Sequence, residues 1–110
     1  MSSRILYVGN DLPLLKFLQN ILEGCAVIRC PIGSGARLFI TEIHYSLILL
    51  DEMLPDAMGV ELAHFTRSVK LHKQTPIILL SDNEYDADAI VTEPDDYPKV
   101  ANTIRVLLES

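Results

Sequence analysis

The chain has no tryptophan, only two cysteines, and nine lysines and arginines against fifteen aspartates and glutamates. The resulting formal net charge of −6 argues against direct nucleic acid binding, which needs a basic face to meet the phosphate backbone. No apolar run approaches the roughly 20 residues of a membrane-spanning helix, and no secretory signal precedes the first strand-like segment. We therefore expect a soluble, cytoplasmic protein that does not bind membranes.

The two cysteines, Cys25 and Cys30, are five residues apart. This spacing is neither a redox CxxC motif nor a metal-binding motif, so we expect two free thiols in or near the core. The 110 residues, 49% of them hydrophobic, are enough for one small domain with a single core. We therefore predict one domain that spans residues 1–110.

A wholly aliphatic segment, residues 47–50, ends on the carboxylate of Asp51. Such a run is typical of a strand buried on both faces, as in a parallel sheet. Ligands of open α/β sheets bind beyond the carboxyl ends of the strands, so Asp51 is a candidate functional residue. Pro55 then prevents an immediate helix, and we expect Gly59 to provide a permissive backbone before the next helical pattern.

Strand-like and helix-like patterns alternate through the rest of the chain. Apolar runs predict further strands at residues 5–8, 26–28, 77–80 and 89–91. Apolar residues at helical spacing predict helices at residues 14–23, 36–43, 60–71 and from 98 onward. This alternation predicts a doubly wound α/β protein with a five-stranded parallel sheet in the order 2-1-3-4-5.

Three residues carry the local signals at the helix ends. Asp11 and Ser34 are suited to cap the first and second helices through their side-chain oxygens. Gly24 is suited to end the first helix.

The connection between the fourth and fifth predicted strands is too short for an ordinary helix. Only residues 82–88 separate Ser81 from the apolar run, whereas a helical crossover needs about a dozen residues. Aspartate and asparagine, which are poor helix formers, dominate this segment. We therefore expect the fourth helix of the doubly wound pattern to be missing or reduced to a loop.

Seven of the fifteen acidic residues lie in residues 82–96, where there is no lysine or arginine. A solvated face is the plainest interpretation. Attraction of a basic partner and weak Ca²⁺ binding are the alternatives, although the spacing does not match an EF-hand loop.

The segment that begins at Asp51 resembles the phosphoacceptor loop of response-regulator receiver domains. The pattern of that family is an apolar strand, the acceptor aspartate, two residues, Met or Leu, Pro, three residues and Gly; Asp51, Leu54, Pro55 and Gly59 match it in register. The resemblance covers essentially the whole chain and implies a CheY-like fold. It also implies that Asp51 accepts a phosphoryl group from a histidine kinase or phosphotransfer protein, and that Ser81 contacts this group.

Four positions depart from the chemistry of the family. The two acidic residues that help to bind Mg²⁺ are replaced by Gly9 and Asn10, the aromatic switch residue by Ile90, and a lysine before a proline by Glu93. Glu93 would repel a phosphoryl group, because two unit charges about 4 Å apart interact by about 4 kcal/mol at an effective dielectric of about 20. Alternatively, Glu93 turns into solvent or helps to hold a cation.

The same departures leave few ligands for Mg²⁺, a hard cation that prefers carboxylate, carbonyl and water oxygens. Asn10, Asp51 and the backbone carbonyl of Met53 remain, and we expect them to bind the ion weakly. No other cofactor is implied.

The hypothesis that fits these features is a receiver-like signalling domain, not an enzyme, that acts mainly as a protein-interaction module with impaired phosphorylation at Asp51. A conventional phosphoaccepting response regulator is the first alternative. A small hydrolase or phosphatase with Asp51 as nucleophile is the second, although Met53 stands where such enzymes often carry a second acid. A flavodoxin-like cofactor protein lacks its phosphate loop, since residues 9–12 offer too little Ser, Thr and Gly. The oligomeric state stays open.

Overall fold

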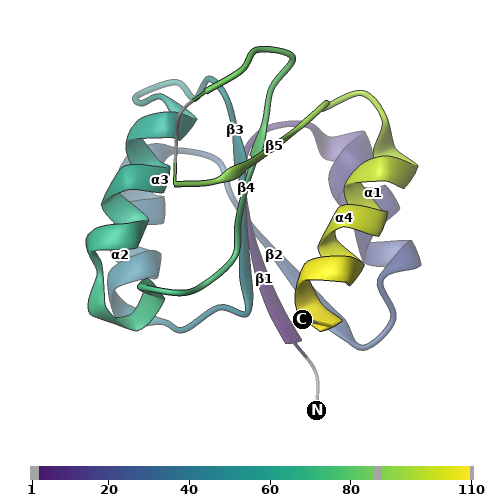
Figure 1. The fold of residues 1–110 in the computed structure, drawn as a ribbon, viewed down its shortest axis with the longest axis horizontal. Coiled ribbons are helices and arrows are strands. Elements are labelled where there is room, and N and C mark those ends of the chain that lie inside the picture. Colours follow the sequence, from purple (N-terminus) through teal and green to yellow (C-terminus); the bar gives the residue numbers. More distant parts are fainter. Residues whose placement is uncertain (1–2, 86–87, 110) are drawn as a thin grey trace.

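A computed structural model describes residues 3–85 and 88–109, and Figure 1 shows a central sheet with helices on both sides. In chain order the elements are β1 (Ser3–Val8), α1 (Leu12–Ile21), β2 (Cys25–Cys30), α2 (Gly33–Glu42), β3 (Leu47–Asp51), α3 (Gly59–Ser68), the 3-10 helix η1 (Lys70–His72), β4 (Ile77–Leu80), β5 (Ile90–Thr92) and α4 (Tyr97–Glu109). All four strand pairings are parallel, and the strand order is β2-β1-β3-β4-β5. The predicted fold class and strand order are confirmed.

The sheet divides the apolar interior into two clusters, where the chain length had suggested a single core. Helices α1 and α4 cover one face, against residues such as Tyr7 and Leu49, while α2 and α3 cover the other, against residues such as Val8 and Leu50 (Figure 1). Successive side chains of a strand point to opposite faces, so neighbours in β1 and β3 enter different clusters. Residues 47–50 are fully buried, which explains why that run is wholly aliphatic.

The predicted N-cap of α1 is confirmed, but the helix ends before Gly24, at Ile21 with Leu22 as its C-cap. The carboxylate of Asp11 accepts a hydrogen bond from the backbone N–H of Leu14 at 3.0 Å, as an N-cap does. Gly24, just after the helix, has a φ of 77°, which a residue with a side chain rarely adopts.

The predicted cap of α2 is wrong, because the helix begins at Gly33 and its N-cap residue makes no side-chain hydrogen bond. Instead Asp56, on the loop after β3, accepts hydrogen bonds from the backbone N–H groups of Gly33 at 2.6 Å and Ser34 at 3.0 Å. A carboxylate distant in sequence therefore satisfies the amides that the local hydroxyl was expected to satisfy.

The fourth helix of the doubly wound pattern is absent from the described part of the β4–β5 connection, residues 81–85 and 88–89. Residues 86 and 87 of the expected loop lie outside the described residues. The last predicted helix is present as α4.

Both cysteines are free thiols, as expected. Over the ranges that the structure describes, no helix combines the length and apolar character needed to cross a bilayer.

Candidate functional site

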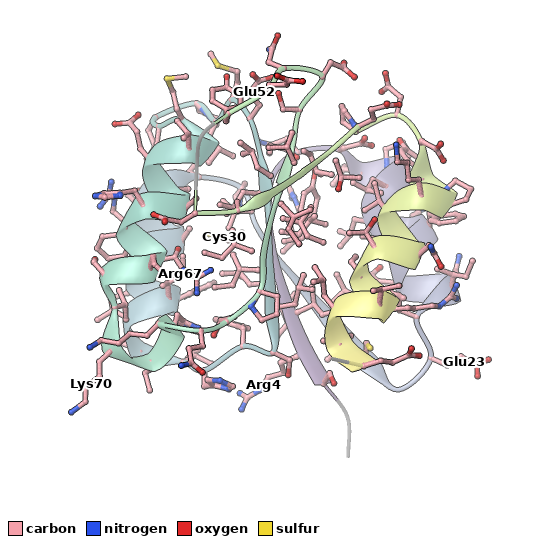
Figure 2. The ribbon with its side chains drawn as sticks, viewed as in Figure 1. Arg4, Glu23, Cys30, Glu52, Arg67 and Lys70 are labelled. Atoms are coloured by element: carbon pink, nitrogen blue, oxygen red, sulfur yellow. The ribbon has the colours of Figure 1, made fainter. Side chains whose placement is uncertain are left out.

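The carboxyl ends of the strands meet at one edge of the sheet, which we call the rim. Gly9, Asp51, Ser81 and Glu93 stand at or just after the ends of β1, β3, β4 and β5, and strand pairings such as Asp51 with Leu80 keep these ends level. Figure 2 labels Glu52 at this edge and Arg4 at the opposite edge. The topology therefore gathers the residues singled out from the sequence.

The side chain of Asp51 lies over the end of β1. Its Oδ1 accepts a hydrogen bond from the hydroxyl of Tyr7 at 2.7 Å, and its Oδ2 accepts one from the backbone N–H of Asn10 at 3.0 Å. A Cβ atom on Gly9 would lie only 2.4 Å from Cγ of Asp51. The carboxylate thus occupies space that becomes available only because residue 9 has no side chain.

Several neighbours set the ionisation of Asp51. Burial raises the pKa of this carboxyl group, and the charge of Asp11 raises it further. The hydrogen bonds from Tyr7 and from the Asn10 amide lower the pKa, as does the charge of Arg29. Burial is the largest effect, so the pKa of Asp51 is raised. Burial and the neighbouring carboxylate raise the pKa of Tyr7 as well, so its hydroxyl stays protonated and donates to Asp51.

Asp11 is committed to interactions away from Asp51. Its carboxylate accepts hydrogen bonds from the amide of Leu14 and from the hydroxyl of Tyr97, the latter at 2.8 Å. Its own backbone N–H donates to the hydroxyl oxygen of Tyr7 at 3.1 Å, which fixes that hydroxyl from the other side. Asp11 therefore holds α1, α4 and Tyr7 in place.

Arg29 reaches the rim from β2, where it pairs with Tyr7 in the strand register. Its Nε donates to the carbonyl oxygen of Gly9 at 2.9 Å, and its Nη2 donates to Oδ1 of Asn10 at 2.6 Å. The Nδ2 of Asn10 donates to the carbonyl oxygen of Pro31 at 3.1 Å, so both ends of that amide are held. A guanidinium is therefore fixed on the two residues that replace the expected acids.

Glu52, the residue after Asp51, anchors the loop that follows β4. Its Oε2 accepts hydrogen bonds from Nδ2 of Asn83 at 2.9 Å and from the hydroxyl of Tyr85 at 2.5 Å, and these bonds lower the pKa of Glu52. Ser81, which is only 3% exposed, accepts a hydrogen bond from the backbone N–H of Asn83 at 2.9 Å. The loop is thus tied to the strand that carries Asp51.

Gly59 has a different role from the one expected, because its φ is not in the positive region. A Cβ atom at this position would lie only 2.1 Å from the backbone oxygen of Asp51. The N–H of Gly59 also donates to the carbonyl oxygen of Glu52 at 2.8 Å. Glycine is required here for close approach of the loop, which brings the start of α3 against the end of β3.

Met53, which lies in the same loop, is 67% exposed.

Two of the altered family positions face outward. Oε1 of Glu93 lies 3.6 Å from Nζ of Lys99 in a pair whose side chains are each more than half exposed, so Glu93 takes the solvent-facing arrangement. A surface pair of this kind contributes roughly 0–1 kcal/mol to stability. Ile90 is 46% exposed at the start of β5.

The rim offers few groups that are free to hold a divalent cation. Residues 3–85 and 88–109 contain no group of three or more His, Cys, Asp or Glu side chains placed to hold a metal ion. The side-chain oxygen of Asn10 accepts from a guanidinium, and each oxygen of Asp51 already accepts a hydrogen bond. Of the expected ligands, this leaves the backbone carbonyl of Met53 and the second lone pair of each Asp51 oxygen.

Sequence reasoning missed three residues that shape this site. Tyr7 looks like ordinary strand core, although it stands two residues before Gly9 and therefore on the same side of the strand. Arg29 is a lone charge near the end of a strand, which is a usable signal once the strand order is assumed. Glu52 follows the candidate aspartate directly, and nothing local to it indicates its partners.

The all-parallel 2-1-3-4-5 sheet, with the candidate aspartate at the end of its central strand, defines a CheY-like fold. Among solved structures, the chain superposes on the chemotaxis response regulator CheY4 of Vibrio cholerae with a TM-score of 0.82, at 18% identity and with 97% of this chain and 99% of that chain covered. It also superposes on the receiver domain of the sensor histidine kinase PA1611 from Pseudomonas aeruginosa, a structure with a magnesium ion coordinated in the active site cleft. Here the TM-score is 0.81 at 19% identity, and both chains are fully covered.

The sequence comparison carries the assignment further. The chain is 34% identical over 114 residues to the regulatory protein VanRB of Enterococcus faecalis, with 99% of this chain and 50% of that protein covered. The chain therefore spans about half the length of the curated relatives it matches. No family model matches it. On the relatives and the fold together, the chain belongs to the receiver domains of two-component response regulators.

Proposed function

We propose that this chain is an atypical receiver domain, a pseudo-receiver, that works mainly as a protein-interaction module in a two-component pathway. Phosphorylation at Asp51 is possible in this proposal but impaired. The observation that carries the proposal is the position of Asp51, whose two oxygens accept hydrogen bonds from Tyr7 and Asn10 above Gly9. A phosphoryl group must bond to one of these oxygens, and the hydrogen bond that each oxygen accepts withdraws electron density and makes it a weaker nucleophile.

Ser81 takes the role of phosphoryl contact in this proposal. Its hydroxyl accepts a hydrogen bond from the amide of Asn83, and its proton reaches the carboxylate of Glu52. Contact with a group on Asp51 therefore requires this proton to turn from Glu52 to the phosphoryl oxygens. Both residues stand at the ends of adjacent strands, a placement that supports the pairing.

Mg²⁺ binds this domain weakly at most. Asn10, Asp51 and the carbonyl of Met53 are the proposed ligands, and the first two are engaged by other groups. When bound, the ion would neutralise charge on the phosphoryl oxygens.

The proposed partner is a histidine kinase, a phosphotransfer protein or another signalling protein of the cytoplasm. The net charge of −6 supports the absence of direct nucleic acid contact by this domain. The tied loop after β4 and the outward-facing Ile90 replace the helix that an ordinary doubly wound sheet would present, so the interaction surface differs from that of conventional receivers.

The test is incubation with acetyl phosphate and Mg²⁺, read by intact mass, together with beryllofluoride titration read by amide NMR. We expect low occupancy and small shifts around Asp51, both abolished in Asp51→Asn. Rapid, complete phosphorylation with large shifts would support the conventional response regulator instead. Continuous release of phosphate from a small phosphomonoester, lost in Asp51→Asn, would support the phosphatase.

A further inference from the structure

We propose that the guanidinium of Arg29 takes the place of a divalent cation at the rim and keeps Mg²⁺ out of the Asp51 site. This inference deepens the proposed function and rests on it, because the role of the Asp51 site as a phosphoacceptor centre comes from that proposal. Metal binding itself can be measured without any phosphorylation step.

Arg29 binds oxygens at the rim that a divalent cation would use. Gly9 and Asn10 stand directly after β1, and the oxygens that they offer at the rim are the carbonyl of Gly9 and Oδ1 of Asn10. Arg29 donates to both, at 2.9 and 2.6 Å. These are hard oxygen donors of the kind that Mg²⁺ requires, so the guanidinium and the ion would compete for the same atoms.

The sheet and the neighbouring side chains hold Arg29 in this position. Its backbone belongs to β2 and pairs with Tyr7, so the origin of the side chain is fixed by the sheet. The amide of Asn10 cannot turn its oxygen away without also breaking the hydrogen bond from Nδ2 to Pro31. Releasing Oδ1 to an ion therefore requires that two hydrogen bonds be lost together.

Arg29 also places a positive charge at this position. It favours the ionised carboxylate of Asp51, which burial disfavours. An arriving Mg²⁺ would be repelled by this like charge. Residue 9 supplies no second acid, because it is a glycine and the carboxylate of Asp51 fills the space that a side chain there would need.

The experiment is a Mg²⁺ titration of the isotope-labelled protein, read from the amides of Asn10 and Asp51, with paramagnetic broadening by Mn²⁺ as a second readout. The variant is Arg29→Gln, which removes the charge and keeps a donor for the Gly9 carbonyl. Arg4→Gln is the matched control, since it removes one positive charge from an exposed arginine at the opposite edge of the sheet (Figure 2). Arg29→Lys keeps the charge.

We expect no saturable response in the wild type, Arg4→Gln or Arg29→Lys at millimolar Mg²⁺, and an affinity at least about tenfold higher in Arg29→Gln. A wild-type response equal to that of Arg29→Gln would overturn the proposal, and so would a folded Arg29→Gln without any gain. If Arg29→Gln does not fold, the wild-type titration still decides, because a saturable response there contradicts the exclusion. None of these outcomes depends on whether Asp51 accepts a phosphoryl group.

Discussion

The carboxylate of Asp51 lies where a side chain of Gly9 would have to be: a Cβ atom on Gly9 would come within 2.4 Å of Cγ of Asp51. The glycine at position 9 therefore has a second effect, besides the absence of the acidic residue that receivers carry there. Its missing side chain lets Asp51 fold inward to the hydroxyl of Tyr7 and the amide of Asn10. Restoring an acid at residue 9 would force Asp51 out of this position.

The first prediction concerns this steric exclusion. Gly9→Ala should destabilise the protein by about 1–3 kcal/mol, because the new methyl group overpacks the space held by Asp51. In an Asp51→Ala background the obstructing atoms are gone, so most of the cost should vanish. Urea denaturation of the two single variants and the double variant measures the coupling. Asp56→Ala, which removes a carboxylate from the loop outside the Gly9 contact, is the control background and should leave the cost unchanged. Equal costs in all three backgrounds would contradict the exclusion.

The second prediction is the pH dependence of stability that Asp51 causes. Its folded-state pKa is raised above the ordinary value of 3.8, chiefly by burial. Its contribution to stability is therefore complete below that ordinary value and is lost as the pH rises through the raised pKa. Relative to wild type, Asp51→Asn should become progressively more stable as the pH rises through this window. Denaturation curves from acid to neutral pH test this, and a stability difference that moves in the opposite direction would refute it.

Asp56 leads to the third prediction, with the opposite sign. Its hydrogen bonds from the amides of Gly33 and Ser34 hold its pKa below the ordinary value of 3.8. Its contribution is therefore complete above that value and is lost as the pH falls through the lowered pKa. Asp56→Ala should destabilise the protein at neutral pH by a margin that shrinks in acid, measured by the same denaturation series. Asp82→Ala, an exposed aspartate on the loop after β4, is the control and should show no such margin.

The architecture could be predicted from the sequence because it follows from burial. A strand covered on both faces must be aliphatic throughout, and residues 47–50 and 77–80 meet that demand. The absence of the fourth helix was equally predictable, since the eight residues between the predicted strands 77–80 and 89–91 leave no room for it. These features depend on local pattern and chain length alone.

The chemistry of the rim could not be predicted in the same way, because it depends on contacts between distant residues. The hydrogen bond between Tyr7 and Asp51 joins residues 44 positions apart, and the bonds from Arg29 need the register of β2 against β1. The cap on α2 was assigned wrongly for the same reason, since Asp56 acts across 23 positions. Local sequence patterns identify candidate residues, but they do not identify the distant partners that set the ionisation and orientation of those side chains.

The fourth prediction concerns the loop after β4. Tyr85→Phe removes the hydroxyl that donates to Glu52, so hydrogen exchange at the amides of Asn83 and Tyr85 should accelerate. Tyr97→Phe is the matched control, because it removes a tyrosine hydroxyl that donates to Asp11 in a different part of the site. Unchanged exchange in Tyr85→Phe, or an equal effect in Tyr97→Phe, would show that Glu52 does not hold this loop.

The most direct measurement is the rate of phosphoryl uptake from acetyl phosphate in wild type and Tyr7→Phe, followed by intact mass. Tyr7→Phe keeps the buried ring and removes the hydroxyl that donates to Oδ1 of Asp51. A hydrogen bond to a charged group is worth about 1.5–3 kcal/mol, so we predict slow uptake in the wild type and an increase of about tenfold or more in Tyr7→Phe. Asp51→Asn in either background should abolish uptake. Rapid, complete uptake by the wild type, with no acceleration in Tyr7→Phe, would contradict the claim that the hydrogen bonds from neighbouring residues slow the phosphorylation of Asp51.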